Sequence, residues 1–183
     1  MTDILTGKLL IADPFLKDPN FLRTVVFICE HNSEGSFGFV LNKKHDLNLG
    51  ELVVGLEASD FPVYVGGPVQ IDTIHFVHQC PDLIPGGVSL TDGIFWGGEF
   101  EAVLRLIKED KLTTYDIRFF IGYSGWSEGQ LEEEMKERSW ITGDGTRKLI
   151  FPTNVANTWK DALKQLGGEY GQMVNYPLDP QLN

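Results

Sequence analysis

The hydrophobic positions in the first two-thirds of the chain fall into short apolar runs separated by turn residues. Such runs, rich in β-branched and aromatic side chains, are typical of buried strands. Residues 23–29 and 36–41 form two of them, and the polar segment 30–35 between them predicts the connecting turn of a hairpin. The same pattern predicts further strands at residues 9–13, 63–65, 73–79, 88–90 and 116–121.

Helical periodicity is found mainly in the second half of the chain. Residues 98–111 place apolar side chains three and four positions apart, with charged residues on the opposite side. Residues 128–138 are acidic at the start and basic at the end, as the helix dipole favours. Residues 157–166 begin with an Asn and are followed by two glycines, which are start and stop signals. A weaker helical pattern covers residues 47–56.

The order of these elements indicates the fold class. Many strands and few helices, without strict alternation, argue against a doubly wound parallel sheet. The sequence therefore predicts an α+β fold, in which about three helices flank a largely antiparallel, barrel-like β-sheet. No linker or repeat interrupts the chain, which favours one domain over residues 1–183. Its end, residues 167–183, is expected to be either a strap lying on the body or a flexible tail.

Composition and charge narrow the classes of function. The chain has 183 residues, of which 42% are apolar and 22% charged, and this is ordinary for a globular domain that can bury a core. The formal net charge is −11, and the sequence contains no dense basic patch. Both features disfavour direct binding of nucleic acid or docking on anionic membranes.

Three features predict a cytoplasmic location. The N-terminus lacks the basic and long apolar regions of a signal peptide. No apolar run approaches the roughly 20 residues that a membrane-spanning helix needs. The two cysteines, Cys29 and Cys80, lie in apolar stretches, which favours core thiols in a reducing compartment over a secreted disulfide framework. A disulfide between the two stays open as an alternative.

The segment from Gly122 to Trp126 carries the most suggestive chemistry. It follows a predicted strand and precedes a predicted helix, which is the setting of a nucleophile elbow with Ser124 as the nucleophile. The G-x-S-x-G pattern is incomplete, because Trp126 occupies its last position, and all four histidines precede Ser124. One alternative is that backbone N–H groups of the turn bind an anion at the helix start. Another, which we favour, is that the glycines form a turn while Tyr123 and Trp126 pack into the core.

The histidines do not predict a metal site. His75 and His78 are three residues apart in a predicted strand, so their rings should lie on opposite faces, and His78 with Cys80 lacks the further ligands that zinc needs. His31 either acts in a cleft near neutral pH or bonds to the backbone of its own turn. Gly66-Gly67-Pro68 indicates a close approach of backbone followed by a fixed turn.

Three segments, taken in order, resemble the YqgE/AlgH family of bacterial proteins. They are GKLLIADPFLKDPNFLRTVVFICEHNSEGSFGFVLNK, YVGGPV and RFFIGYSGWSEGQLEEEMKERSW, and the resemblance extends over residues 7–166. The positions that match the family motifs are Pro14, Phe21, His31, Gly35, Gly38, Leu41, Asn42, Gly66, Gly67, Pro68, Gly122, Tyr123, Gly125, Trp126, Gln130, Leu131 and Trp140.

The resemblance implies a compact α+β fold with a barrel-like sheet flanked by helices, in a bacterial cytosolic protein. It implies no reaction mechanism for this uncharacterised family, although some members carry the label of transcriptional regulator. This chain is acidic and shows no helix-turn-helix pattern. A regulatory role would therefore be indirect, through a protein or small-molecule partner.

The sequence favours a binding module over an enzyme. No complete catalytic constellation is present, whereas polar and glycine-rich segments lie at predicted strand ends, where pockets often form. We expect a small-molecule or protein partner, and no cofactor, metal, nucleic acid or membrane. One alternative is a hydrolase or transferase that uses the segment from Gly122 to Trp126, and another is an interaction scaffold with exposed tryptophans. The candidate ligand-binding residues are His31, Asn42, Gly66, Gly67, Pro68, Gly122, Tyr123, Ser124, Gly125 and Trp126.

Overall fold

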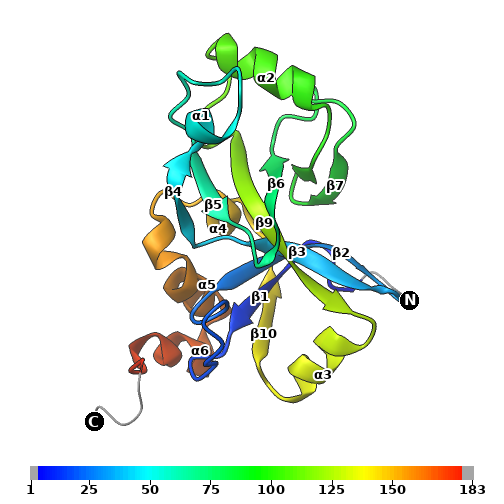
Figure 1. The fold of residues 1–183 in the computed structure, drawn as a ribbon. Coiled ribbons are helices and arrows are strands. Elements are labelled where there is room, and N and C mark those ends of the chain that lie inside the picture. Colours follow the sequence, from blue (N-terminus) through cyan, green and yellow to red (C-terminus); the bar gives the residue numbers. More distant parts are fainter. Residues whose placement is uncertain (1–3, 179–183) are drawn as a thin grey trace.

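The computed structural model describes residues 4–178 and shows one curled, mostly antiparallel sheet with helices packed around it (Figure 1). Eight strands follow one another in the order β10-β1-β2-β3-β9-β6-β8-β7, and β4 and β5 branch from this path. The parallel pair is β5 with β9. The predicted fold class, a single α+β domain with a barrel-like sheet, is confirmed.

The elements are short, and their bounds are as follows. The strands are β1 (Lys8–Ala12), β2 (Val25–Asn32), β3 (Gly35–Val40), β4 (Lys44–Asn48), β5 (Pro62–Val65), β6 (Val69–His78), β7 (Val88–Thr91), β8 (Ile94–Trp96), β9 (Ile117–Ser127) and β10 (Trp140–Asp144). The helices are α1 (Leu49–Leu52), α2 (Phe100–Lys108), α3 (Gln130–Lys136), α4 (Arg147–Ile150), α5 (Thr158–Leu166) and α6 (Gly168–Gln172), with the 3-10 turns η1 (Val155–Asn157) and η2 (Met173–Asn175).

The longest strand, β9, joins the two halves of the sheet. Up to Ile121 it pairs with β5 and β6, with one further pair between Tyr123 and Val69 of β6, and from Ser124 onward it pairs with β3. Gly122 lies between these two stretches with a φ of +68°, a conformation that side chains with a Cβ rarely adopt. The register of β6 against β9 shifts in the same region. The strand therefore turns a corner at this glycine, which lets the sheet curl.

Three apolar clusters hold the fold together. One fills the inside of the curl between β1–β3 and α5, and includes Phe27, Phe39 and Trp159. A second lies beneath α2, where Val103 and Ile107 pack against β6 and β9. The third lies on the other face of β1–β3, which α3 covers. These strands are buried on both faces, which explains why their sequences are continuous apolar runs rather than alternating ones.

A buried arginine ties the first cluster to β9. The guanidinium of Arg118 donates to the carbonyl oxygens of Ile150 and Leu41, both at 2.7 Å, and stacks 4.0 Å above the ring of Tyr64. Burial lowers the pKa of Arg118 to about 10, so the group stays charged at neutral pH. This arginine therefore satisfies two carbonyl groups that would otherwise be buried without a donor.

The four predicted helical segments contain α2, α3, α5 and α1, and the real helices are shorter than their patterns. One predicted turn is wrong, and another is shorter than predicted. The segment from Gly122 to Trp126 continues β9 as a strand, because its glycines serve a bend and a close approach rather than a reversal. The turn predicted at residues 30–35 shrinks to Ser33 and Glu34, since β2 continues to Asn32. The short strands β4, β8 and β10 escaped the pattern analysis.

The chain end, as far as residue 178, lies against the body. After α5, Gly167 adopts a φ of +71°, and α6 and η2 follow. The ring of Phe15 stacks on that of Tyr176 with centroids 5.5 Å apart, and Arg23 donates a hydrogen bond to the Tyr176 carbonyl oxygen. The last part of the predicted strap or tail, residues 179–183, lies outside the described residues.

No helix between residues 4 and 178 combines the length and the apolar character that crossing a membrane requires.

Candidate functional site

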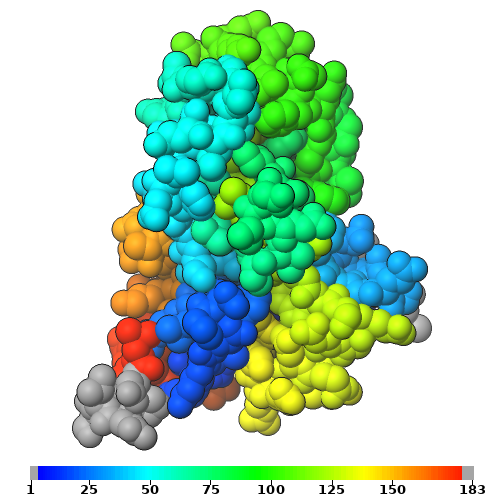
Figure 2. Space-filling model, in the orientation of Figure 1, coloured from blue at the N-terminus to red at the C-terminus, as the bar shows by residue number. Residues whose placement is uncertain are grey.

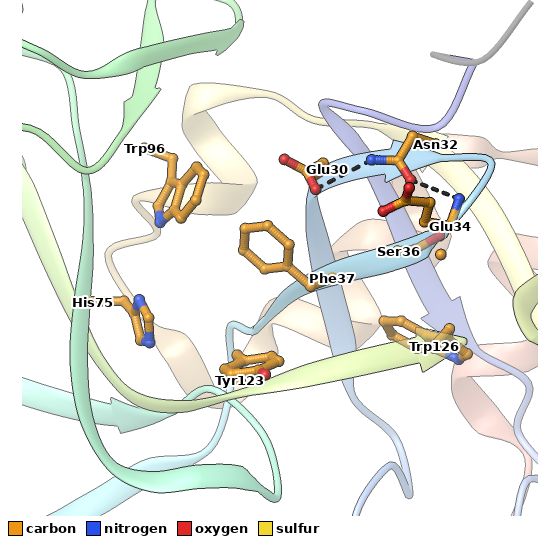
Figure 3. Close-up of a pocket in the computed structure, with 10 residues that line it drawn as sticks. Glu30, Asn32, Glu34, Ser36, Phe37, His75, Trp96, Tyr123 and Trp126 are labelled. Carbon is orange, nitrogen blue, oxygen red and sulfur yellow. Dashed lines mark hydrogen bonds between the residues drawn. The ribbon is translucent and has the colours of Figure 1, made fainter. Parts of the chain in front are cut away.

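A pocket with a volume of about 440 Å³ lies between the β2–β3 hairpin and the strands β6 and β8 (Figure 3). Figure 2 shows the light-blue tip of this hairpin projecting from the right side of the molecule. Five strands and the hairpin turn contribute to the pocket, so its shape is set by the sheet rather than by a long loop. The lining residues are Glu30, Asn32, Glu34, Gly35, Ser36, Phe37, His75, Trp96, Tyr123 and Trp126.

Four half-buried rings, which we call the aromatic wall, form much of the lining: Phe37, His75, Trp96 and Tyr123. The ring of Phe37 meets Trp96 at a centroid distance of 4.7 Å and Tyr123 at 5.9 Å, with interplanar angles of 67° and 74°. His75 meets Tyr123 at 6.0 Å and 84°. These are edge-to-face contacts, which stabilise the rings against one another and keep their faces pointing in different directions.

The hairpin adds an acidic rim, formed by Glu30, Asn32 and Glu34. Asn32 organises it, because its side-chain nitrogen donates to the Glu30 carboxylate at 3.3 Å and its oxygen accepts from the Glu34 backbone N–H at 2.8 Å. All three residues are exposed. The ten lining residues include no Lys and no Arg, so two carboxylates are the fixed charges of the pocket.

His75 contributes a neutral ring to the wall. Burial lowers the pKa of His75 from its ordinary value, because the imidazolium form is poorly solvated in that position. Its Nε2 atom lies 3.1 Å from the Thr73 hydroxyl oxygen, and its ring is tilted against Phe39 at 5.2 Å. The histidine therefore adds no positive charge at neutral pH.

The opposite face of the same hairpin is closed by α3. Here the His31 Nδ1 atom lies 2.7 Å from the hydroxyl oxygen of Ser36, and its Nε2 atom lies 3.7 Å from a carboxylate oxygen of Glu132. Ser36 is only 9% exposed. This Ser–His pair has the atoms of a nucleophile and a base, but Ser36 is nearly buried and its hydroxyl is held against His31 beneath α3, although the residue borders the pocket.

Two tryptophans on this closed face share one carboxylate. The indole N–H groups of Trp126 and Trp140 both donate to the same oxygen of Glu134, each at 2.8 Å. The other oxygen of Glu134 accepts from Gln130 at 3.0 Å. Trp126, Trp140 and Trp159 are each no more than 5% exposed. The exposed tryptophans that an interaction scaffold would present at these positions are therefore not present.

The two predicted glycine-rich segments do meet, but as backbone against backbone. The Gly66 N–H donates to the Ile121 carbonyl at 2.9 Å. A Cβ on Gly66 would lie 2.4 Å from the Gly122 carbonyl oxygen, and one on Gly67 would lie 2.2 Å from the Tyr123 carbonyl carbon. These glycines allow two chain segments to cross at close range. Pro68 is exposed just beyond the crossing, where β6 begins.

Ser124 and Asn42 hold this part of the fold together. Ser124 is fully buried, and its hydroxyl donates to the Gly66 carbonyl at 3.0 Å. Asn42, which follows β3, is tied to the start of β2, since it accepts from the Val25 N–H at 3.0 Å and donates to the Arg23 carbonyl at 2.9 Å. The Ser124 position lacks the exposure that a nucleophile elbow gives its serine.

Of the ten predicted ligand-binding residues, Tyr123 and Trp126 line the pocket. Gly125 lies beside it, because a Cβ at that position would meet the Tyr123 ring at 3.4 Å. Sequence reasoning missed the acidic rim, since residues 30–35 were interpreted as a turn, and it missed Trp96, since β8 was not predicted. One feature of the sequence could have indicated the pocket. Phe37 and Tyr123 each stand next to a glycine in a strand, and a glycine leaves open space beside an aromatic ring.

Within residues 4–178, no three His, Cys, Asp or Glu side chains are grouped closely enough to hold a metal ion. His75 and His78 lie on different faces of β6, as predicted: His75 packs on Phe39 and Tyr123, and His78 stacks on Phe95. Cys29 and Cys80 are free thiols, and burial raises the pKa of both.

Comparison with known proteins gives consistent results. The family described as AlgH-like matches residues 9–171. A UPF0301 protein of Chlorobium limicola is 45% identical over 97% of this chain and 95% of its own length, and one of Cytophaga hutchinsonii is 40% identical over 97% and 98%. The solution structure of the AlgH protein from Pseudomonas aeruginosa superposes with a TM-score of 0.74, at 28% identity and 94% coverage of both chains. A crystal structure of a Corynebacterium diphtheriae protein gives 0.76 at 20% identity, covering 93% and 92%, which shows the fold alone.

Proposed function

The chain belongs to the AlgH-like family, and from that premise we propose that it is a binding protein whose ligand enters the pocket between the β2–β3 hairpin and β6–β8. The observation that carries the proposal is the aromatic wall, a set of rings that stay half-buried among the described residues 4–178. We further propose that the protein works in the cytoplasm and has an indirect regulatory role, in which ligand binding alters its affinity for a partner.

The pocket has the properties of a small-molecule site. Its volume of about 440 Å³ falls within the range of roughly 300–1,000 Å³ that is usual for such sites. The rings are fixed by edge-to-face contacts with one another, so a ligand does not have to order them on binding. A few polar groups of the hairpin stand at the rim, where they can orient a ligand.

The geometry favours binding over catalysis at this site. Ser124 is fully buried and its hydroxyl is used in a structural hydrogen bond. The Ser36–His31 pair faces α3, and the carboxylate of Glu132 is 3.7 Å from the histidine, beyond hydrogen-bonding distance. The lining offers two carboxylates and no cationic group for a phosphorylated substrate. These features support a binding protein rather than a hydrolase or transferase.

The test is a thermal-shift screen of the purified protein against metabolites, followed by the variant Gly125→Leu. A ligand that binds only the folded state raises the melting temperature by mass action. Because a Cβ at exposed position 125 would meet the Tyr123 ring at 3.4 Å, we expect a leucine there to crowd the side of the pocket that Tyr123 lines. We expect hits with the parent protein, loss of those hits in Gly125→Leu, and their retention in Thr142→Leu, an exposed strand residue of β10.

A hit that persists in Gly125→Leu would place the ligand elsewhere and contradict the proposal. The absence of any hit, combined with capture of a protein partner that Gly125→Leu does not weaken, would contradict it as well.

A further inference from the structure

The lining of the pocket combines two kinds of surface that are each selective for charge. The aromatic wall presents ring faces, which carry negative electrostatic potential. The acidic rim presents the carboxylates of Glu30 and Glu34. No lysine or arginine is among the ten lining residues, and the whole chain carries a formal charge of −11. The ring faces and the two carboxylates of the pocket therefore favour a ligand of the same charge, which is positive.

The rings of the aromatic wall are inclined to one another rather than lying in one plane. Phe37 stands at 67° to Trp96 and at 74° to Tyr123, and His75 stands at 84° to Tyr123. Rings set at such angles present differently oriented surfaces to the pocket that they line. A cation within about 6 Å of a ring centroid is attracted by the ring quadrupole, and several rings around one cation form the aromatic cages that bind quaternary ammonium groups.

From this lining we propose that the pocket binds the alkylated ammonium group of a small organic cation, an inference that rests on the binding function proposed above. The methyl or methylene groups of such a cation contact the aromatic wall. The acidic rim stands at the mouth and attracts the positive charge as the ligand approaches.

Ligands of other charge fit the lining less well. An anion would lie next to Glu30 and Glu34 with no cationic side chain of the lining to balance it. A neutral apolar ligand could contact the rings but would gain nothing from the two carboxylates. His75 supports the same preference, because burial lowers its pKa and keeps the ring uncharged at neutral pH.

The experiment compares choline with 3,3-dimethylbutan-1-ol, which has the same shape but a carbon in place of the charged nitrogen. Binding of both to the full chain is followed by isothermal titration calorimetry and by NMR shifts of the indole N–H of Trp96. We expect choline to bind at least about tenfold more tightly than the neutral analogue, in line with cation–π energies at partly desolvated sites. The shifts should include Trp96 and leave Trp159, in the core, unchanged.

Two variants separate the contributions of ring and charge. Phe37→Leu keeps an apolar side chain but removes a ring face, and should weaken choline binding about tenfold with little effect on the neutral analogue. Glu30→Gln should weaken choline binding about threefold, and less at high salt, because the rim is exposed. Glu101→Gln, an exposed carboxylate on α2, is the matched control and should leave binding unchanged.

The outcomes distinguish this inference from the proposed function. Equal affinity for both probes, with shifts at Trp96, would overturn the charge preference and leave a pocket that binds ligands. No binding of either probe, together with no other ligand lost in Gly125→Leu, would overturn both. A trimethyl-lysine peptide that binds about a hundredfold more tightly than choline would assign the ammonium group to a protein and contradict the small-molecule source.

Discussion

The two faces of the β3–β9 pair are built from alternating residues of the same strands, yet they differ in nearly every respect. On the closed face, the polar atoms of Ser36 and Trp126 are paired with His31 and Glu134 beneath α3, and both residues also border the pocket at its edge. On the open face, Phe37 and Tyr123 line the pocket. Since successive side chains of a strand point to opposite sides, one short sequence serves both purposes.

The difference shows where stability and binding are separated. Ring area covered by α3 contributes to folding, whereas the ring area in the pocket stays partly in contact with water and can contribute to ligand binding. Single substitutions on the closed face should therefore lower the stability of the fold. Substitutions on the open face should leave stability nearly unchanged but weaken ligand binding.

The largest effect is expected for Glu134→Ala on the closed face. The substitution removes the acceptor of two indole N–H groups on nearly buried tryptophans, and an unsatisfied buried donor costs about 1–3 kcal/mol. We expect a loss of about 2–3 kcal/mol in the free energy of unfolding, measured by urea denaturation. The neighbouring exposed Glu133→Ala, which loses only a surface ion pair with Lys136, should stay within about 0.5 kcal/mol of the parent. If the two variants were equally stable, the shared carboxylate would not be what holds the closed face.

A smaller, pH-dependent effect is expected from β6. Buried His78 is satisfied as a neutral ring, since its Nε2 donates to the Gly97 carbonyl at 2.9 Å and its Nδ1 accepts from the Cys80 N–H at 3.2 Å. Burial lowers the pKa of His78, and the bond to Gly97 only partly offsets this. The unfolded chain therefore binds the proton first as the pH falls.

Stability from His78 is consequently complete above its unfolded pKa of about 6.5 and decreases as the pH falls toward the lower pKa of the folded state, by at most about 1.4 kcal/mol per pH unit. His75, whose pKa is also lowered by burial, acts in the same direction. Urea denaturation between pH 7.5 and 5 measures the slope, which should be flatter in His78→Gln. An unchanged slope in that variant would show that another group titrates.

The smallest effects come from neighbours on β9 that face opposite ways. Ser124→Ala removes the buried bond to the Gly66 carbonyl and should cost about 1 kcal/mol. Tyr123→Phe keeps the ring of the pocket and should change stability by less than about 0.5 kcal/mol. Both are measured by urea denaturation, and a larger loss in Tyr123→Phe than in Ser124→Ala would contradict the division into closed and open faces.

Residue patterns predict the elements of this chain correctly where local chemistry decides the structure. Continuous apolar runs identified β1, β2, β3, β5, β6, β7 and much of β9. Apolar periodicity identified α2, and charge and end signals identified α3 and α5. The patterns failed at residues 122–126, because a glycine-rich segment indicates the same backbone freedom whether the chain reverses or bends within a strand. The β2–β3 hairpin was predicted correctly, but its turn was drawn too long, because polar residues of an exposed strand resemble those of a turn.

The candidate site was only partly predictable for a related reason. Tyr123 and Trp126 were named, but as parts of a turn that shares a pocket with Gly66 and Gly67. The glycines instead provide the crossing at which β9 bends, and this crossing leaves no room for a ligand. The pocket lies on the side of Tyr123 that faces away from this crossing, and its other walls come from β2, β6 and β8, which are distant in sequence.

The sequence by itself determined the family, the α+β class, the charge and the positions of most strands, because each depends on residue type and on contacts between near neighbours. Only the tertiary structure decided that Phe37, His75, Trp96 and Tyr123 gather around one pocket with Glu30 and Glu34 at its rim. That gathering depends on the bend at Gly122 and on the pairing of β9 with β3 in one half and β6 in the other. Such pairing is set by the packing of the whole sheet, which no local pattern of residues specifies.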